Sequence, residues 1–252
     1  MTASQLLAAT PPAAASRYSL LLTTDAAEVR AAQRLRHRVF AGELGARLHS
    51  PEPGLDVDRF DAHCDHLVVR EDATGEIVGT YRMLPPARAR DAGGLYAEDE
   101  FALDALAPLR DSLVETGRSC VHPDHRDGAV INLVWAGIAR YMLLTGHRWL
   151  IGCASVPLAD GGALAASVAA RVRDGHLSPP DRRVTPHRPW THDGPAVRAS
   201  LPPLLRGYLR LGAQVCGAPA HDPDFGCADF PVLLGLDHMD PRYARFFLGE
   251  GA

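Results

Sequence analysis

The sequence predicts an α/β (or α+β) fold, in which a mixed central sheet carries helices on both faces. Strand-like and helix-like segments alternate along the chain, and residues 149–156 form a nearly all-apolar run that is typical of a central buried strand. The chain has 252 residues, of which 46% are hydrophobic and 22% are charged, an ordinary composition for a globular protein. No internal repeat or interdomain linker is evident, so we expect a single domain over residues 17–252.

The N-terminal region predicts a tail, a strand and a helix. Residues 1–16 are small and apolar but lack the basic start of a signal peptide, which predicts a disordered tail. Residues 18–23 (YSLLLT) are apolar enough to predict the first strand. Apolar residues recur at helical spacing over residues 26–40, and Asp25 is suited to cap the start of this helix.

An acidic stretch and a hairpin follow. The chain loses its periodicity after residue 42 and contains several aspartates, which predicts a loop with a negative lining. The aspartates are Asp56, Asp58, Asp61 and Asp65. Residues 66–71 and 77–84 then predict two antiparallel strands joined by a turn at residues 72–75. Arg82 lies inside the second of these strands, among apolar neighbours.

The junction between a strand at residues 113–121 and a helix at residues 129–145 is the main candidate site. The start of a helix presents unpaired backbone N–H groups and the positive end of the helix dipole, and both favour phosphate. Glu115 and Arg118, three residues apart, lie just upstream, and Gly146 is suited to end the helix. The junction therefore predicts an anion-binding cradle with ionisable groups at its edge.

We expect residues 17–156 to form the core of the domain and residues 157–252 to form a C-terminal extension of it. The remaining predicted elements are a short helix at 104–109, a helix at 159–172, an irregular insertion or substrate-side loop at 178–203, a helix at 204–215, a strand at 229–234 and a short helix at 241–247. The helix at 204–215 is apolar with two arginines. We expect it to pack in the core, with peripheral membrane contact as the alternative.

Charge and cysteine usage exclude several classes of protein. The formal net charge of −4 argues against a general nucleic-acid binder, although every basic side chain apart from histidine is arginine. The five cysteines lack C-x-x-C spacing and the 12 histidines form no H-E-x-x-H pattern, so we predict neither a metal site nor a disulfide framework. A reduced, cytoplasmic compartment fits, and no run approaches the ~20 apolar residues of a membrane span.

Separated motifs across residues 18–156 resemble the GNAT acyltransferase superfamily. The junction carries V-x-P-x-x-R-x-G, although only one glycine of the usual glycine-rich signature is present. Upstream and in order lie L-R-x-x-V-F-x-x-E-L-G, D-x-F-D, V-G-x-x-R-x-L-P and E-x-x-R. This series resembles two related branches, the acyl-homoserine-lactone autoinducer synthases and the ornithine N-acyltransferases of ornithine-lipid synthesis, often labelled hemolysin-like. The matching residues are Leu35, Arg36, Val39, Phe40, Glu43, Leu44, Gly45, Asp58, Phe60, Asp61, Val78, Gly79, Arg82, Leu84, Pro85, Glu115, Arg118, Val121, Pro123, Arg126 and Gly128.

The C-terminal half favours the ornithine N-acyltransferase branch. It contains a pattern that is similar to this branch, whereas autoinducer synthases are shorter and lack it. The pattern comprises LPPL at 201–204, GYLRLGA at 207–213, and Asp222, Phe225 and Asp229. Ala46 also stands where autoinducer synthases commonly have tryptophan. The resemblance implies a GNAT-like fold with a C-terminal extension.

The resemblance also implies a reaction. A (3-hydroxy)fatty acyl group would pass from the phosphopantetheine of acyl carrier protein, or from coenzyme A, to the α-amine of ornithine or a similar amino acid, giving a lyso-aminolipid. The amine must lose a proton and the thioester carbonyl must be polarised. The implied partners are acyl carrier protein and the amino acid, with no resident cofactor. The implied catalytic residues are Glu115, as a modest base, and Arg118.

The remaining implied site residues fall into a substrate side and a donor side. Asp58 and Asp61 would bind the cationic ends of ornithine, while the two arginines of that side would bind its carboxylate or hold the aspartates. The substrate-side residues are Arg36, Phe40, Asp58, Asp61 and Arg82. The donor-side residues are Ser119, Cys120, Val121, Arg126, Asp127, Gly128 and Ala129.

Other interpretations stay open on the sequence alone. The aspartates could be solvated loop charges, Glu115 could pair with Arg118, and Arg82 could lie on the surface. Cys120 could be a covalent nucleophile or simply a buried thiol. The chain could also be an autoinducer synthase that consumes S-adenosylmethionine, a small-molecule acetyl-CoA transferase, or a non-catalytic module that binds acyl carrier protein or a membrane surface.

Overall fold

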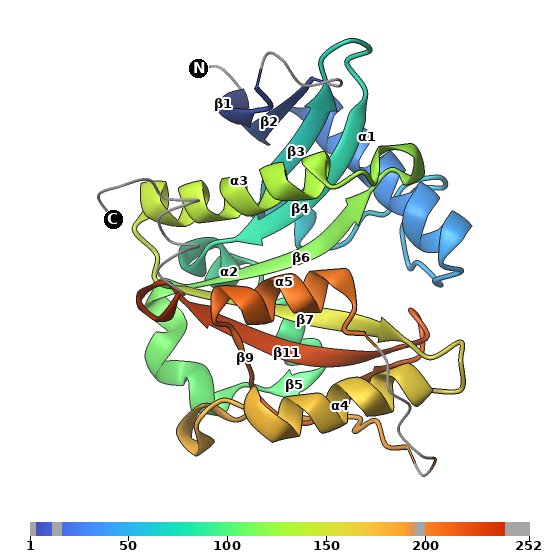
Figure 1. Ribbon diagram of the computed structural model, residues 1–252. Coiled ribbons are helices and arrows are strands. Elements are labelled where there is room, and N and C mark those ends of the chain that lie inside the picture. Colours follow the sequence, from blue (N-terminus) through green and yellow to red (C-terminus); the bar gives the residue numbers. More distant parts are fainter. Residues whose placement is uncertain (1–3, 12–16, 193, 195–199, 240–252) are drawn as a thin grey trace.

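A nine-stranded, mostly antiparallel sheet forms the centre of the computed structural model of the chain (Figure 1). The structure describes residues 4–11, 17–192, 194 and 200–239, so the predicted helix at 241–247 lies outside the described residues. The strand order is β1-β2-β3-β4-β6-β7-β11-β10, β9 pairs with β11, and β5 pairs with β8 in a separate ribbon. The strands are β1 Ser4–Ala9, β2 Tyr18–Thr23, β3 Asp65–Glu71, β4 Ile77–Leu84, β5 Phe101–Ala102, β6 Leu113–Val121, β7 Trp149–Pro157, β8 Thr185–Pro186, β9 Gln214–Val215, β10 Ala220–Asp222 and β11 Cys227–Gly235.

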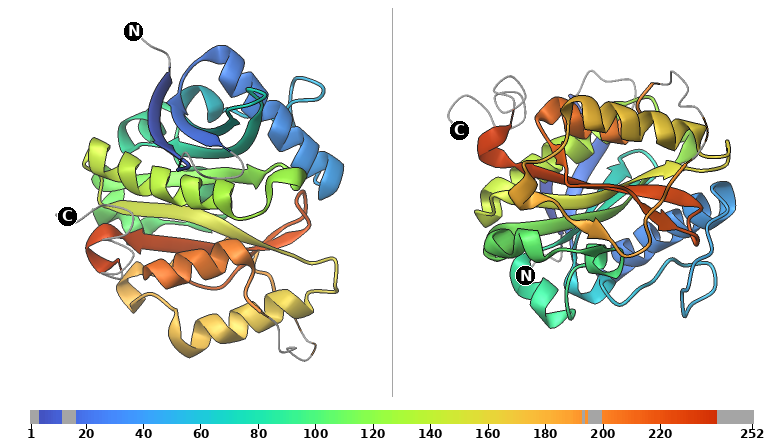
Figure 2. Two further views of the ribbon diagram at one scale, coloured as in Figure 1. Left: turned by 45° about the horizontal axis from the view of Figure 1, so that its top comes forward. Right: turned by 90° about the horizontal axis from the view of Figure 1, so that it is seen from below.

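Helices cover both faces of this sheet, as the sequence predicts (Figures 1 and 2). Side chains that alternate along β3 show the two faces: Leu67 and Val69 pack in the core under α3, and Val68 packs in the core under α1. The cores under α4 and α5 are continuous with that under α3. The helices are α1 Ala26–His37, α2 Pro86–Asp91, α3 Ala129–Thr145, α4 Ala163–Gly175 and α5 Pro203–Leu211. Shorter segments are a π-helical turn at Arg38–Glu43 and 3-10 turns at Asp61–His63, Tyr96–Asp99, Asp104–Ser112, Pro123–His125, Pro180–Arg182 and Leu236–His238.

Local sequence signals explain the best-predicted elements. The Asp25 carboxylate accepts hydrogen bonds from the N–H groups of Ala27 and Glu28 and so caps α1, as expected. Gly146 ends α3 in the left-handed region with φ 70°, which a glycine adopts without strain. The predicted bounds of β2, β4, β6 and α3 are confirmed.

Three predicted elements are wrong in part. Residues 4–9 lie in the expected disordered tail but form β1, because they pair with the free edge of β2 and bury Leu7. Gly161 and Gly162 have positive φ angles, so α4 begins later than expected. Helix α5 ends at Gly212, whose φ is 98°, and the following residues become β9.

The predicted core role of the helix near residue 204 is confirmed. Leu205, Tyr208 and Leu211 of α5 are all buried in the main core. Within the described ranges, no helix combines the length and the apolar character that a membrane crossing requires.

Candidate active site

The site begins where two neighbouring strands part. Among the described strand pairs, β6 and β7 alone run parallel, and their pairing stops at Thr116 and Gly152. Beyond this point β6 continues along β4 and β7 continues along β11, so the two strands diverge (Figure 1). A cavity of about 250 Å³ opens in the gap. We call it the split cavity; it is lined by Phe40, Leu44, Tyr81, Arg82, Leu84, Tyr96, Glu115, Thr116, Gly117, Arg118, Ser119, Cys153, Ser155, Leu204, Asp222, Phe225 and Asp229.

A bulge in β6 shapes the mouth of the split cavity. Cys120 pairs with Thr80 and Gly117 pairs with Arg82, so two residues of β6 lie opposite the single residue Tyr81. The first of the two, Arg118, has φ 53°, and it is the one described residue other than glycine with a positive φ. A long side chain in this conformation is strained, and such strain concentrates at functional sites. The bulge turns Arg118 toward the acidic loop.

The acidic loop is neutralised by arginines. Arg36 on α1 is fully buried, and its Nε and Nη2 atoms lie 2.9 Å from Asp56 and 2.7 Å from Asp61. Arg82 lies 2.6 Å from Asp58 and 3.3 Å from Asp61. Arg118 lies 3.2 Å from Asp56 and 3.3 Å from Asp58. We call this group the arginine–aspartate cluster: Arg36, Arg82, Arg118, Asp56, Asp58 and Asp61.

These contacts change the expected roles of the loop. Both oxygens of Asp61 accept hydrogen bonds from Arg36, and Arg82, Gln33 and the Asp58 N–H add further donors, which leaves Asp61 no place for a substrate ammonium. Burial is the largest single influence and would raise the pKa of Asp61, but the contacts with Arg36, Arg82 and the Asp58 N–H together outweigh it and hold the pKa well below its usual range. The alternative of solvated loop charges is wrong for Asp56 and Asp61, which are both buried. Arg36 therefore fixes Asp56 and Asp61 in place, which is one of the two roles expected for it.

Glu115 lies in the split cavity without an arginine partner. Its two carboxylate oxygens accept hydrogen bonds of 2.7 Å from the backbone N–H groups of Tyr96 and Ala97. The alternative of a Glu115–Arg118 salt bridge is therefore wrong, because Arg118 pairs with the acidic loop. Burial raises the pKa of Glu115 to about 7, since the charged form is desolvated. This carboxyl can take up or release a proton near neutral pH.

The predicted donor side is partly occupied by contacts within the chain. Arg126 forms a two-point contact with Glu43, at 2.6 and 2.7 Å, and its Nε donates to the Val121 carbonyl. The Asp127 carboxylate accepts from the Ala129 N–H at the start of α3, and Gly128 caps that helix with φ 99°. The predicted binding of phosphate by residues 126–129 stays a prediction.

Two of the three remaining donor-side residues, Ser119 and Cys120, differ in their environments. Ser119 lines the split cavity, whereas Cys120 is buried in the core under α1. Burial raises the pKa of the Cys120 thiol to about 12, so it is protonated at neutral pH. These observations support the simpler interpretation of Cys120 as a buried thiol.

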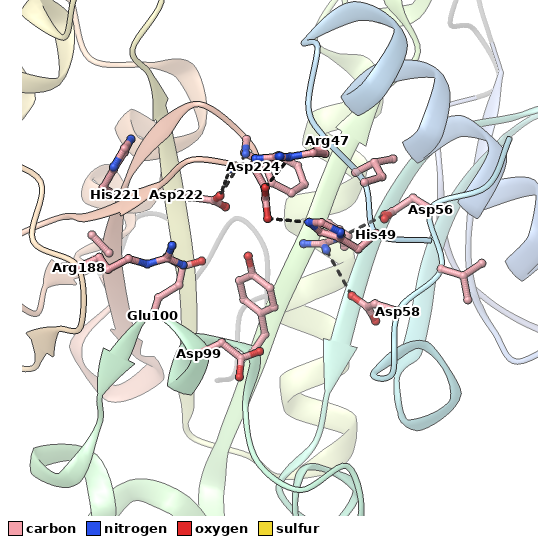
Figure 3. Close-up of a pocket in the computed structure, with 16 residues that line it drawn as sticks. Arg47, His49, Asp56, Asp58, Asp99, Glu100, Arg188, His221, Asp222 and Asp224 are labelled. Carbon is pink, nitrogen blue, oxygen red and sulfur yellow. Dashed lines mark hydrogen bonds and ion pairs between the residues drawn. The ribbon is translucent and has the colours of Figure 1, made fainter. Parts of the chain in front are cut away.

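A second cavity of about 270 Å³ adjoins the first (Figure 3). We call it the polar cavity, and charged side chains dominate its wall. Phe225 and Tyr96 stack on the Arg118 guanidinium, each ring centroid lying 5.2 Å from its central carbon, and Phe225 also packs against Phe40. The residues that line both cavities are Tyr96, Arg118, Asp222 and Phe225. Two adjoining cavities with a common wall can hold two different reactants.

Three carboxyl groups on the far side of these cavities have no predicted role. We call them the acid trio: Glu100 after the Tyr96–Asp99 turn, Asp222 at the end of β10, and Asp229 on β11. Figure 3 shows Glu100 and Asp222 on the opposite side of the polar cavity from Asp56 and Asp58. The C-terminal pattern that resembles the ornithine N-acyltransferases includes Asp222 and Asp229, which is the signal that could have identified them. Glu100 lies in an irregular stretch that carries no such signal.

Comparison with known proteins agrees with this geometry. The Acetyltransferase (GNAT) domain family matches residues 35–136. An L-ornithine N(alpha)-acyltransferase of Brucella abortus (strain 2308) is 35% identical over 251 residues, which cover 91% of this chain and 88% of that protein. One of Rhizobium meliloti (strain 1021) is 36% identical over 254 residues, covering 90% and 82%. The chain belongs to the family of GNAT acyltransferases that contains these two enzymes. Its predicted family and its predicted fold class are both confirmed.

Solved structures resemble this GNAT acyltransferase in fold. The structure of a CoA-dependent acyl-homoserine lactone synthase, BjaI, with SAM and isopentyl-CoA has a TM-score of 0.52 at 16% identity, covering 88% of this chain and 81% of that one. FeeM, an N-acyl amino acid synthase from uncultured soil microbes, has a TM-score of 0.51 at 15% identity, covering 87% and 91%. At such low identity these likenesses show the GNAT fold alone.

Proposed function

We propose that this GNAT acyltransferase moves a (3-hydroxy)fatty acyl group from acyl carrier protein to the α-amine of ornithine or a similar amino acid, forming a lyso-aminolipid. The observation that carries the proposal is the adjoining pair of cavities with the buried carboxyl of Glu115 beside them. The split cavity suits the acyl thioester, and the polar cavity suits a charged acceptor. The names of the relatives from Brucella abortus and Rhizobium meliloti support ornithine as that acceptor.

The charge of the polar cavity favours a cationic amino acid. Among the described residues, six carboxyl groups and three guanidinium groups line it. The carboxyl groups belong to Asp56, Asp58, Asp99, Glu100, Asp222 and Asp224, and the guanidinium groups to Arg47, Arg118 and Arg188. Four of the six carboxyl groups already pair with arginines, whereas Glu100 and Asp222 form no ion pair among the described residues and can receive an amine of the ligand. Arg188 extends into the cavity and is suited to bind the ligand carboxylate through two hydrogen bonds (Figure 3).

The residues of the split cavity can support the chemistry at the thioester. The acceptor amine gives up a proton to Glu115, directly or through a water molecule, and then attacks the carbonyl carbon. The new C–N bond forms as the C–S bond breaks. The bulge takes Arg118 and Ser119 out of the regular ladder with β4, and their N–H groups can polarise the carbonyl oxygen.

The leaving thiolate needs a proton, which the protonated Glu115 can return directly or through a water molecule, and Tyr81 can donate a hydrogen bond to the sulfur. The Tyr81 hydroxyl lines the split cavity and belongs to a hydrogen-bonded group with Thr116 and Tyr208. Burial raises the pKa of Tyr81 well above its ordinary value, so the hydroxyl stays protonated and can donate this hydrogen bond to the thiolate. The products are an N-acyl amino acid and the free thiol of the carrier.

The direct test is to supply donor and acceptor separately. The purified protein is incubated with 3-hydroxyacyl carrier protein or 3-hydroxyacyl coenzyme A, each with ornithine, other amino acids or S-adenosylmethionine, and amide products are identified by mass spectrometry. We expect N-acyl ornithine, formed faster from the carrier protein. Absence of any amide from every pairing would overturn the proposal. Consumption of S-adenosylmethionine would show an autoinducer synthase, and transfer only of acetyl groups from acetyl-CoA would show a small-molecule acetyltransferase.

A further inference from the structure

The acid trio is a group of carboxyls without a compensating cation, of which Asp229 is buried and Glu100 and Asp222 are half-buried. Asp229 is 2% exposed, and both oxygens of Glu100 are buried and lack a hydrogen-bond partner among the described residues. The Tyr96 hydroxyl and Asp229 are close enough to affect the pKa of Glu100 without reaching hydrogen-bond geometry. No member of the trio forms an ion pair within the described ranges, and this includes the nearby Arg188. A buried carboxyl is costly unless it is neutral or paired.

The trio faces both cavities. Glu100 lines the polar cavity, Asp229 lines the split cavity, and Asp222 lines both. One oxygen of Asp222 already accepts from the N–H groups of Asp224 and Phe225, which fixes this carboxyl in place. Burial, followed by the charge of Asp229, raises the pKa of Glu100 to about 9, and burial raises that of Asp229. A positively charged ligand would reverse both shifts, since it favours the ionised carboxyls.

We propose that Glu100, Asp222 and Asp229 bind the distal ammonium of a diamino acid acceptor, and so make the enzyme selective for ornithine over amino acids with neutral side chains. This inference rests on the proposed N-acyltransferase function and names the residues that select the substrate. The ammonium donates three hydrogen bonds to the trio, while the α-amine of the same molecule lies toward the split cavity. An acceptor without the distal amine would leave the buried carboxyls unpaired, which gives strong discrimination.

A divalent metal is the competing occupant. Ligand atoms of Asp222, Cys227 and Asp229 lie within 4.8 Å of one another. However, burial raises the pKa of the Cys227 thiol far above its ordinary value, and a protonated thiol is a poor metal ligand. Three hydrogen-bond acceptors without an arginine suit an alkylammonium better.

The wild-type enzyme alone provides the first test. Its kcat/KM is measured with one acyl donor for ornithine and for norvaline, which has the ornithine skeleton without the distal amine. Lysine and 2,4-diaminobutyrate test the chain length. We expect ornithine to be preferred over norvaline by on the order of 100-fold, because a site built for a charged group rejects the analogue that lacks it.

Two variants then assign the selectivity to the trio. Glu100→Gln and Asp229→Asn each keep the shape of the side chain and remove its negative charge. We expect each to lower the ornithine-to-norvaline ratio about 30-fold, because a lost partner of a buried charge pair costs this much. Asp111→Asn makes the same change at a fully exposed carboxyl and should leave the ratio unaltered. Circular dichroism checks that each variant is folded.

The outcomes separate the inference from the proposed function. Acylation of ornithine and norvaline at similar rates, or an unchanged ratio in both trio variants, would overturn the inference while leaving the N-acyltransferase intact. No amide from any amino acid would overturn the proposed function itself. Loss of the ornithine preference after treatment with a metal chelator, and its return with a divalent metal alone, would show that the trio holds a metal instead of the ammonium.

Discussion

The two acidic walls of the site, which are the arginine–aspartate cluster and the acid trio, differ in how their charge is balanced. In the arginine–aspartate cluster, three carboxylates meet three guanidinium groups, and both oxygens of the buried Asp61 accept hydrogen bonds from arginine. The acid trio has three carboxyls and no ion pair among the described residues. The number of carboxylates alone therefore does not identify a cation site. Carboxylates that already have arginine partners hold the fold, and those without partners are available to a ligand.

The two walls also differ in the direction of their pKa shifts. Arginine contacts hold the pKa of Asp61 below its usual range despite burial, whereas burial and a neighbouring carboxyl raise that of Glu100 to about 9. Perturbed pKa values occur both at functional sites and in structural ion-pair networks. Here the sign of the shift distinguishes the two cases.

The largest expected effect is on stability. Arg36→Leu leaves Asp56 and Asp61 buried with fewer partners, and we expect it to lower the free energy of unfolding by about 3–5 kcal/mol. Chemical denaturation measures this change. Arg30→Leu is the matched control on the same helix, since Arg30 makes an exposed pair with Glu52 and should alter stability little. An equal loss in both variants would show that the cluster is no more structural than a surface pair.

The next largest expected effect is on catalysis by Glu115 in the split cavity. Glu115→Gln removes the proposed proton acceptor, and we expect kcat to fall by about 100-fold or more while the fold is retained. Because the pKa of Glu115 is about 7 and a base acts when deprotonated, kcat/KM of the wild type should rise as pH increases through this value. The variant should lose that part of the profile. Glu76→Gln, at an exposed carboxyl, is the control, and a variant indifferent to loss of Glu115 would instead fit a non-catalytic binding module.

A smaller effect appears in the pH dependence of stability. Burial raises the pKa of Glu100 from 4.5 in the unfolded chain to about 9 in the folded one. The contribution of this group to the free energy of unfolding is therefore full below pH 4.5 and is lost as pH rises toward about 9. The lowered pKa of Asp61 acts in the opposite direction, because its contribution is present above 3.8 and is lost as pH falls below that value. Between about pH 6 and pH 9, Tm should therefore fall by a few degrees more in the wild type than in Glu100→Gln. Parallel curves in calorimetry would contradict this difference between the walls.

The smallest expected effect is at Arg126, which belongs to neither the arginine–aspartate cluster nor the acid trio. Arg126 and Glu43 form a half-exposed pair, so Arg126→Met should change the free energy of unfolding by only about 0–1 kcal/mol. If Arg126 also binds donor phosphate, KM for the acyl donor should rise severalfold while KM for ornithine stays the same. Arg148→Met removes another exposed pair and serves as the control. An unchanged donor KM would remove Arg126 from the donor site.

Much of the fold follows from local signals, but the site depends on contacts between distant residues. The apolar runs and polar turn around β6 and α3 predict both elements with their bounds. The bulge at Arg118 carries no comparable signal, because nothing in the sequence marks an arginine that adopts φ 53°. The gap between β6 and β7 depends on this bulge and on β11, which pairs with β7 from 70 or more residues away.

The contacts among the site residues could likewise not be predicted from the sequence. The motif series correctly gathers Arg36, Asp58, Asp61 and Arg82, yet it cannot show that the arginines occupy the oxygens of Asp61. A pairing of this kind is a property of three-dimensional packing. The acid trio was missed as a unit because Glu100 lies in an irregular stretch and meets its partners only in the folded chain.

Calorimetry of two matched variants compares the two walls most directly. Tm is measured for Asp61→Asn and Asp229→Asn, with and without ornithine, in the presence of a non-reactive thioether analogue of the acyl donor. We expect Asp61→Asn to lower Tm by several degrees, and Asp229→Asn to preserve or raise Tm while abolishing the increase that ornithine gives the wild type. An equal loss of stability in both variants, or an undiminished response of Asp229→Asn to ornithine, would contradict the division between a structural wall and a ligand-binding wall.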